Sequence, residues 1–145
     1  MMKEYGLQRF HEAQKDTYDR ALKELQNGRK ETHWMWFIFP QLKGLGQTEY
    51  SLYYGINGKE EAVAYLEDPV LKQRLITLCE ALLQLETKNP SDIFSRIDTV
   101  KLRSCMTLFD AVGEEEIFQK VPDRYYDGKK DKKTLRMLGL IQQEE

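Results

Sequence analysis

Hydrophobic side chains recur every three or four positions along most of this chain, which is the spacing of an amphipathic helix. The first such stretch predicts one helix over residues 4–27, ended by Asn27-Gly28 because glycine readily takes the left-handed conformation of a helix C-terminus. A second stretch predicts a helix that begins at Asp68-Pro69, an N-cap followed by a proline in the first turn. That helix is expected to end near Thr87.

Shorter segments are predicted around the second of these helices. Asn57 and Glu60 have the spacing of a capping box and open a short helix to about Leu66. Asn89-Pro90 opens a single helical turn. Residues 41–58 contain four glycines and predict an ordered loop.

The last third of the chain predicts three more helices. Asp98 is expected to cap a helix over residues 99–112, which a glycine ends. Three glutamates precede the next helix, where carboxylates favour the positive end of the dipole. This helix is expected to stop before Pro122, because proline breaks a helix interior. Asp131 is expected to cap the final helix.

The run from Trp34 to Phe39 is apolar on every side, and only a buried element accommodates such a run. We expect residues 33–37 to form a short helix through the middle of the domain. No segment shows the sustained apolar–polar alternation of a strand. The sequence therefore predicts an all-α fold, with residues 1–145 forming a single multihelical domain around this short buried central helix.

Composition and charge exclude several classes of protein. Of the 145 residues, 41% are hydrophobic, which is too apolar for an intrinsically disordered chain. No run of about 18 apolar residues predicts a membrane span, so we expect no membrane partner. The formal net charge of -2 argues against a nucleic-acid partner, whose binding needs a local excess of lysine and arginine. The two cysteines and the polar N-terminus favour a cytoplasmic protein.

Metal and cofactor sites have little support in the sequence. The two histidines, His11 and His33, lie far apart, and no histidine or cysteine pair has the spacing of a zinc site. Gly44 and Gly46 lack the third glycine and the strand of a dinucleotide-binding fingerprint. We therefore expect neither a metal ion nor a cofactor.

The dense motif HWMWFIFPQL at residues 33–42, with GLG at residues 44–46, carries a resemblance to a known family. Further motifs that carry it are Arg9-Phe10, Ala13-Gln14, residues 28–30, Glu61-Ala62, Tyr65-Leu66, residues 69–71, Arg74-Leu75, Ile93-Phe94, Asp98, residues 101–104, residues 106–109, Phe118, Asp131 and Thr134-Leu135. Over nearly its whole length the chain resembles the DUF1810 proteins, a bacterial family of unknown function. The resemblance implies a multihelical domain with a short buried central helix, and it implies no activity. Ser95 and Cys105 depart from the family pattern, which has glycine and serine there, so the Cys105 thiol is a poor candidate nucleophile.

The candidate chemistry is a composite small-molecule site where residues 33–41 meet the helix that begins at Asp98. His33 is expected to act as a general acid or base, since histidine side chains ordinarily titrate near neutral pH. Lys101 and Arg103 are expected to hold a negatively charged group near the N-terminus of that helix. The other predicted ligand-binding residues supply an aromatic wall, amides, hydroxyls and further cations: Arg9, Gln14, Lys30, Trp34, Trp36, Gln41, Ser104 and Thr107.

The residues leave two classes of function open, and the sequence assigns neither. In the first, the site binds an anionic, nucleotide-like small molecule and either holds it or converts it as an enzyme. In the second, the protein is a non-enzymatic interaction module or a homo-oligomer, and the aromatic motif at residues 33–37 is only core. An open cavity lined by polar motif residues would favour the first class.

Overall fold

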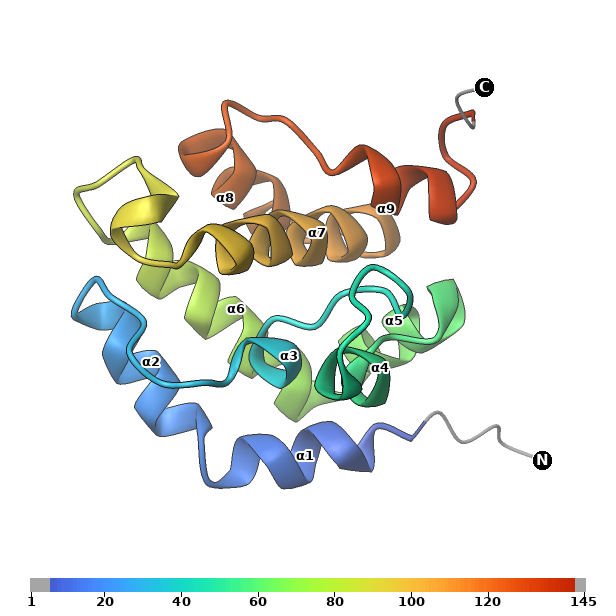
Figure 1. Cartoon of the computed structure of the whole chain (residues 1–145), viewed down its shortest axis with the longest axis horizontal. Coiled ribbons are helices and arrows are strands. Elements are labelled where there is room, and N and C mark those ends of the chain that lie inside the picture. Colours follow the sequence, from blue (N-terminus) through green and yellow to red (C-terminus); the bar gives the residue numbers. More distant parts are fainter. Residues whose placement is uncertain (1–5, 143–145) are drawn as a thin grey trace.

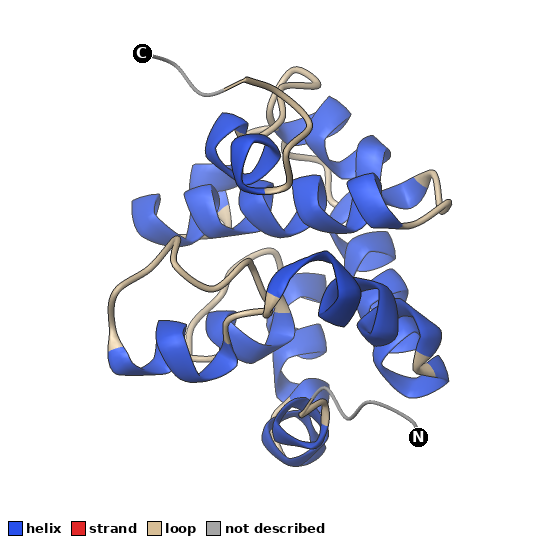
Figure 2. Ribbon diagram, turned by 90° about the vertical axis from the view of Figure 1, so that its right-hand side faces the viewer, coloured by secondary structure: helices blue, strands red, loops and turns tan. Residues whose placement is uncertain are grey.

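A computed structural model describes residues 6–142, and every regular element in that range is helical (Figure 1). The elements are α1 (Gln8–Lys15), α2 (Tyr18–Gln26), α3 (Met35–Ile38), α4 (Glu49–Tyr54), α5 (Gly58–Glu67), α6 (Pro69–Leu83), the 3-10 helix η1 (Pro90–Asp92), α7 (Arg96–Val112), α8 (Ile117–Tyr125) and α9 (Lys132–Met137). The predicted all-α fold is confirmed (Figure 2). Within the described range, no helix is long and apolar enough to cross a bilayer.

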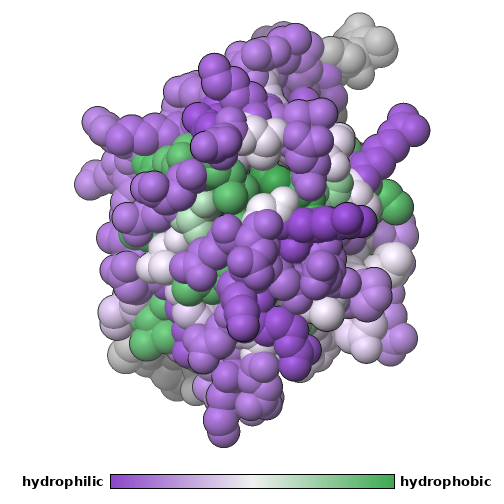
Figure 3. Space-filling model, turned by 90° about the vertical axis from the view of Figure 1, so that its left-hand side faces the viewer, coloured by the Kyte–Doolittle hydropathy of each residue, from purple (hydrophilic) through white to green (hydrophobic). Residues whose placement is uncertain are grey.

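The helices form an upper and a lower layer with the core between them. Helices α7, α8 and α9 make the upper layer, α1 to α5 lie below, and the long α6 runs obliquely past both (Figure 1). Helix α6 contacts α2, α5 and α8, while α7 contacts α5, α8 and α9. Figure 3 shows a largely hydrophilic face crossed by a band of hydrophobic side chains. That distribution is expected when each helix turns one apolar stripe toward a shared core.

The single helix predicted over residues 4–27 is wrong, because the chain breaks at Asp16-Thr17 into α1 and α2. Thr17 leaves the helical conformation, and its amide bonds back to the carbonyl of Gln14. The Gln14 side chain is buried and donates to the Phe37 carbonyl (2.8 Å) and to the Tyr65 hydroxyl (3.0 Å). These bonds fix α1 against α3, while α2 turns away to pack on α6. Aspartate and threonine favour such a break because they are weak helix formers.

The short buried central helix is confirmed as α3, Met35–Ile38. Trp34, which precedes it, is fully buried, and its indole N–H donates to the Glu24 carboxylate (2.9 Å). Pro40 follows directly, where a helix cannot continue.

Two predictions in the middle of the chain need correction. Residues 41–58 are not only loop, because they contain α4, whose N-cap Thr48 accepts a hydrogen bond from the Ser51 amide. The expected capping box of Asn57 with Glu60 is replaced by Glu61, whose carboxylate accepts from the Asn57 backbone amide (2.9 Å). The carboxylate one position further along therefore reaches the helix start.

The boundaries of α7 and α8 also differ from the predicted ones. Helix α7 begins at Arg96, because the Ser95 hydroxyl accepts from the Asp98 amide and takes the capping role expected of Asp98. Helix α8 continues through Pro122, whose carbonyl accepts from the Tyr126 amide (2.8 Å). Pro122 is buried, so packing holds it inside the helix despite its missing donor.

The start signals of α6 and α9 are confirmed. Asp68 accepts from the Val70 and Leu71 amides, and Asp131 accepts from the Thr134 amide. Helix α6 ends at Leu83 rather than near Thr87, although its apolar stripe continues to the half-buried Leu85.

Candidate functional site

Two neighbouring cavities open where residues 30–51 face the first half of α7. The first, here the His33 cavity, has a volume of about 370 Å³ and is lined by Lys30, Glu31, His33, Met35, Trp36, Ser95, Ile97, Asp98 and Lys101. The second, the Thr48 cavity, has about 360 Å³ and is lined by Gln41, Leu45, Gly46, Gln47, Thr48, Ser51, Ile97, Val100, Lys101, Ser104, Asp131 and Lys133. Lys101 and Ile97, one turn apart on α7, belong to both and lie at the boundary between them. We call the two cavities together the Lys101 groove.

Lys101 is the cation at the centre of this groove. Its Nζ lies 5.4 Å from the centroid of the Trp36 ring, and within residues 6–142 it makes no hydrogen bond or ion pair. Asp98, the nearby carboxylate, is already paired with Lys30 at 3.0 Å. Burial and the charge of Lys30 lower the pKa of Lys101, and Asp98 opposes this shift. Among the described residues, two lysines beside one aspartate leave an unpaired positive charge at Lys101, although Glu31, Asp98 and Asp131 balance the three lysines over the groove as a whole.

Trp36 forms the aromatic wall of the His33 cavity. Its ring packs against Tyr50 of α4 with centroids 4.8 Å apart, so α3 and α4 build this surface together. The indole N–H is shielded from solvent and has no acceptor among the described residues. An unsatisfied buried donor costs about 1–3 kcal/mol, which makes it a ready donor to a ligand.

Amides and hydroxyls line the other side of the groove. Trp36, Gln41, Ser51 and Lys101 all border one small space of about 10 Å³, which brings them within reach of one another. The close approach requires Gly46, since a Cβ there would lie 2.6 Å from the Ser51 hydroxyl. The absence of a side chain at Gly46 thus lets this turn pack directly against Ser51 of α4.

His33 lies at the rim of the His33 cavity, exposed to solvent. It has no hydrogen-bond partner within residues 6–142. Its imidazole is therefore accessible to a molecule in the cavity.

Several predicted site residues hold the fold together instead. Arg9 donates to the Glu61 carboxylate (2.7 Å) and to the carbonyls of Tyr53 and Gly55, and it clamps α1 to the end of α4. Gln14 and Trp34 are buried and bonded as described above. None of these three side chains lines either cavity of the groove.

The predicted cluster on α7 is divided between two faces. Lys101 and Ser104 line the Thr48 cavity, although the Ser104 hydroxyl donates to the Val100 carbonyl. Arg103 points toward α8, with its guanidinium carbon 5.7 Å from the centroid of the Tyr126 ring. Thr107 is buried and accepts from the Asp131 amide (2.9 Å), which ties α7 to α9. Because α7 begins at Arg96, Lys101 also lies beyond its first turn, so the expected pairing with free N-terminal amides does not apply.

The sequence did not identify the residues of α4 and its neighbourhood that complete the groove. Thr48, Tyr50 and Ser51 fall in the stretch predicted as loop, and Lys133 comes from α9. No local sequence pattern marks them, and the exposure of Tyr50 (58%) and Ile97 (68%) beside the groove is visible only in the structure.

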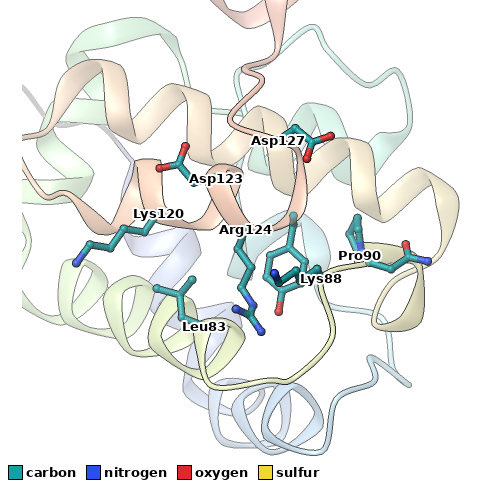
Figure 4. A pocket seen from close by; sticks show the side chains of 9 residues that line it. Leu83, Lys88, Pro90, Lys120, Asp123, Arg124 and Asp127 are labelled. Carbon is teal, nitrogen blue, oxygen red and sulfur yellow. The ribbon is translucent and has the colours of Figure 1, made fainter.

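A larger cavity of about 710 Å³ lies between the end of α6, the following loop and α8 (Figure 4). Its charged side chains do not converge on one point, because Lys120 and Asp127 lie well apart and Asp123 accepts a hydrogen bond from Gln119 of its own helix (2.8 Å). Arg124 donates to the Leu85 carbonyl near the end of α6. This concavity therefore lacks the convergent polar groups of a binding site. Among the described residues, no cluster of histidine, cysteine and carboxylate side chains is suited to a metal ion.

Comparison with known proteins identifies a family described as of unknown function and a solved structure of a hypothetical protein. The model of a family described as "Protein of unknown function (DUF1810)" matches residues 4–138. A crystal structure of the conserved hypothetical protein Rv1873 from Mycobacterium tuberculosis is similar, with a TM-score of 0.88 and 39% sequence identity over 94% of this chain and 99% of that one. No curated protein matches the chain.

Proposed function

The chain belongs to the DUF1810 family, whose function is unknown, and from its groove we propose that it binds a small anionic molecule carrying a planar ring. The observation that carries the proposal is Lys101, a half-buried lysine without an ion pair among the described residues, placed between two cavities. Cavities of about 300 Å³ and above are the usual size for small ligands.

The local charge at Lys101 supports an anion. Lys30 and Asp98 neutralise each other at 3.0 Å, so the charge of Lys101 is left for a ligand. An anion would make a charge-assisted hydrogen bond with its ammonium group, which is about twice as strong as a neutral one.

The aromatic wall supports a planar group beside that anion. Trp36 offers part of its ring to the His33 cavity and is held in place by Tyr50. Offset stacking on such a ring contributes about 0.5–1.5 kcal/mol beyond the area it buries. In this proposal His33 at the rim exchanges a proton with the bound molecule, if that molecule is converted.

A thermal-shift screen against nucleotides, sugar phosphates and small carboxylates tests the proposal. A ligand at 100 times its dissociation constant stabilises the protein by about 2.7 kcal/mol, which raises Tm by several degrees. We expect Lys101→Gln to lower the affinity for a ligand found in the screen about 10- to 100-fold, the effect of losing a charged hydrogen bond. Trp36→Phe should remove the change in tryptophan fluorescence, because only Trp34 then remains.

Lys59→Gln is the matched control, because this exposed lysine lies on α5 away from both cavities. A hit that survives Lys101→Gln unchanged would contradict the proposal. An unchanged Tm across the whole panel would also contradict it, and would favour the interaction module instead. Chromatography measures whether the protein converts a hit. We expect His33→Gln to lose this conversion while the ligand still raises the Tm.

A further inference from the structure

The two cavities of the Lys101 groove differ in chemistry, and this difference identifies the class of ligand. The inference rests on the proposed function above. Each cavity is near the lower limit of small-molecule sites, so each suits one part of a larger molecule rather than the whole of it.

The His33 cavity is suited to a nitrogenous ring. Trp36, Met35 and Ile97 provide flat and apolar walls, while Glu31 brings a carboxylate to the same space. Aromatic faces stack on planar rings, and a carboxylate accepts hydrogen bonds from ring or amino N–H groups. Nucleobases present both features.

The Thr48 cavity is suited to a group rich in hydroxyls. Its lining includes the amides of Gln41 and Gln47 and the hydroxyls of Thr48, Ser51 and Ser104. The Gln41 side chain has no hydrogen-bond partner within the described range, so both its donor and its acceptor are available. The Thr48 and Ser104 hydroxyls already donate to the Ser51 hydroxyl and the Val100 carbonyl, so they offer acceptors, while Gln41 both donates and accepts. Together they match the hydroxyls of a sugar, which do both.

Ile97 and Lys101 line both cavities, so Lys101 brings a cation to the boundary between them. A molecule that fills both cavities must cross this boundary, so its negative charge would lie at its centre rather than at one end. A phosphate or diphosphate that links two arms has this arrangement.

We propose that the Lys101 groove binds a sugar nucleotide, with the base in the His33 cavity, the phosphates on Lys101 and the second sugar in the Thr48 cavity. The ligand class is a nucleoside diphosphate joined to a polyhydroxylated ring. A simple nucleotide or a sugar phosphate fills only half of the groove.

Isothermal titration calorimetry tests this ligand class by comparing intact sugar nucleotides with their halves, the nucleoside monophosphates and the sugar phosphates. We expect uridine diphosphate glucose or adenosine diphosphate ribose to bind at least about tenfold more tightly than uridine or adenosine monophosphate, and than glucose 1-phosphate, because only the whole molecule contacts both cavities. Equal affinity of the whole molecules and their halves would overturn the inference. Binding of the halves through Lys101 would in that case still support the proposed function.

A variant confined to one cavity gives a second readout. Gln41→Ala is expected to lower the affinity for the sugar nucleotide about fivefold, the effect of one lost hydrogen bond. The affinity for the nucleoside monophosphate should not change. Gln84→Ala, an exposed glutamine at the end of α6, should change neither. An equal loss for both ligands in Gln41→Ala would contradict the assignment of the second sugar to the Thr48 cavity. If neither these ligands nor any anion of the thermal-shift panel binds, the inference and the proposed function both fail.

Discussion

At the scale of single residues, Glu24 connects α2 to the chain that leads into the groove. Its buried carboxylate accepts hydrogen bonds from the amides of Glu31 and Thr32, the Thr32 hydroxyl and the Trp34 indole. Burial alone would raise the pKa of Glu24, but these four bonds outweigh it and lower the pKa to about 2 from 4.5. One carboxylate thus positions the segment that carries Lys30, His33 and Trp36.

The low pKa of Glu24 predicts a loss of stability in acid. Because the folded-state pKa lies below the ordinary value, the stabilisation is complete above about pH 4.5 and disappears as the pH falls toward 2. A shift of this size corresponds to about 3 kcal/mol in the free energy of unfolding. We expect Glu24→Gln to be destabilised by about 2–3 kcal/mol at pH 7 in urea unfolding, and its deficit to shrink at pH 3.

The exposed Glu31 on the same segment provides the control, since Glu31→Gln keeps the backbone amide that Glu24 uses. It should unfold like the unchanged protein at both pH values. A deficit of Glu24→Gln that is the same at pH 3 and pH 7 would mean that the carboxylate charge is not what stabilises this segment.

At the scale of elements, the start of α7 decides where Lys101 lies. Ser95 caps the helix through the Asp98 amide, so Asp98 is free to pair with Lys30. Had Asp98 been the cap, its carboxylate would have bonded to its own helix rather than to Lys30. The boundary of one helix therefore sets the charge balance of the groove.

Replacing Ser95 tests this cap. Serine and glycine are both good N-cap residues, whereas alanine is poor, so Ser95→Gly should cost a few tenths of a kcal/mol and Ser95→Ala about 1 kcal/mol in urea unfolding. Ser91→Ala removes an exposed hydroxyl that makes no capping bond and should have no effect. Equal costs for the glycine and alanine variants would argue against the capping role.

The sequence predicted elements well where a local signal was sufficient. Asp68 and Asp131 each cap the helix expected of them, because a cap depends only on the next three residues. The break at Asp16-Thr17 and the continuation through Pro122 depend on packing between distant segments, which no local pattern contains.

The candidate site was predictable to the same extent. The motif at residues 33–41 and Lys101 lie together as expected, because a dense run of aromatic residues must reach the core and carry its neighbours with it. Arg9 and Gln14 resemble binding residues in sequence, yet they bond to backbone carbonyls and buried side chains. Residue type alone does not distinguish a polar group that binds a ligand from one that fastens two helices.

At the scale of the whole molecule, the Lys101 groove lies between the two layers of helices. Its walls come from α3 and α4 below and from α7 and α9 above, so its shape depends on how the layers pack. The contacts of α6 and α7 with helices of both layers favour one cooperative unit, as expected for a single domain.

Cys79 of α6 and Cys105 of α7 report on that cooperativity. Both are fully buried, and burial raises the pKa of each thiol, so neither reacts as a thiolate in the folded protein. If the layers open only together, a disulfide reagent such as Ellman's reagent should modify both cysteines at the same rate, at least about a thousandfold more slowly than in urea-unfolded protein. Peptide mapping of samples taken during the reaction measures the two rates in the unchanged chain. Faster modification of Cys105 alone would mean that α7, which forms one wall of the groove, opens locally without global unfolding.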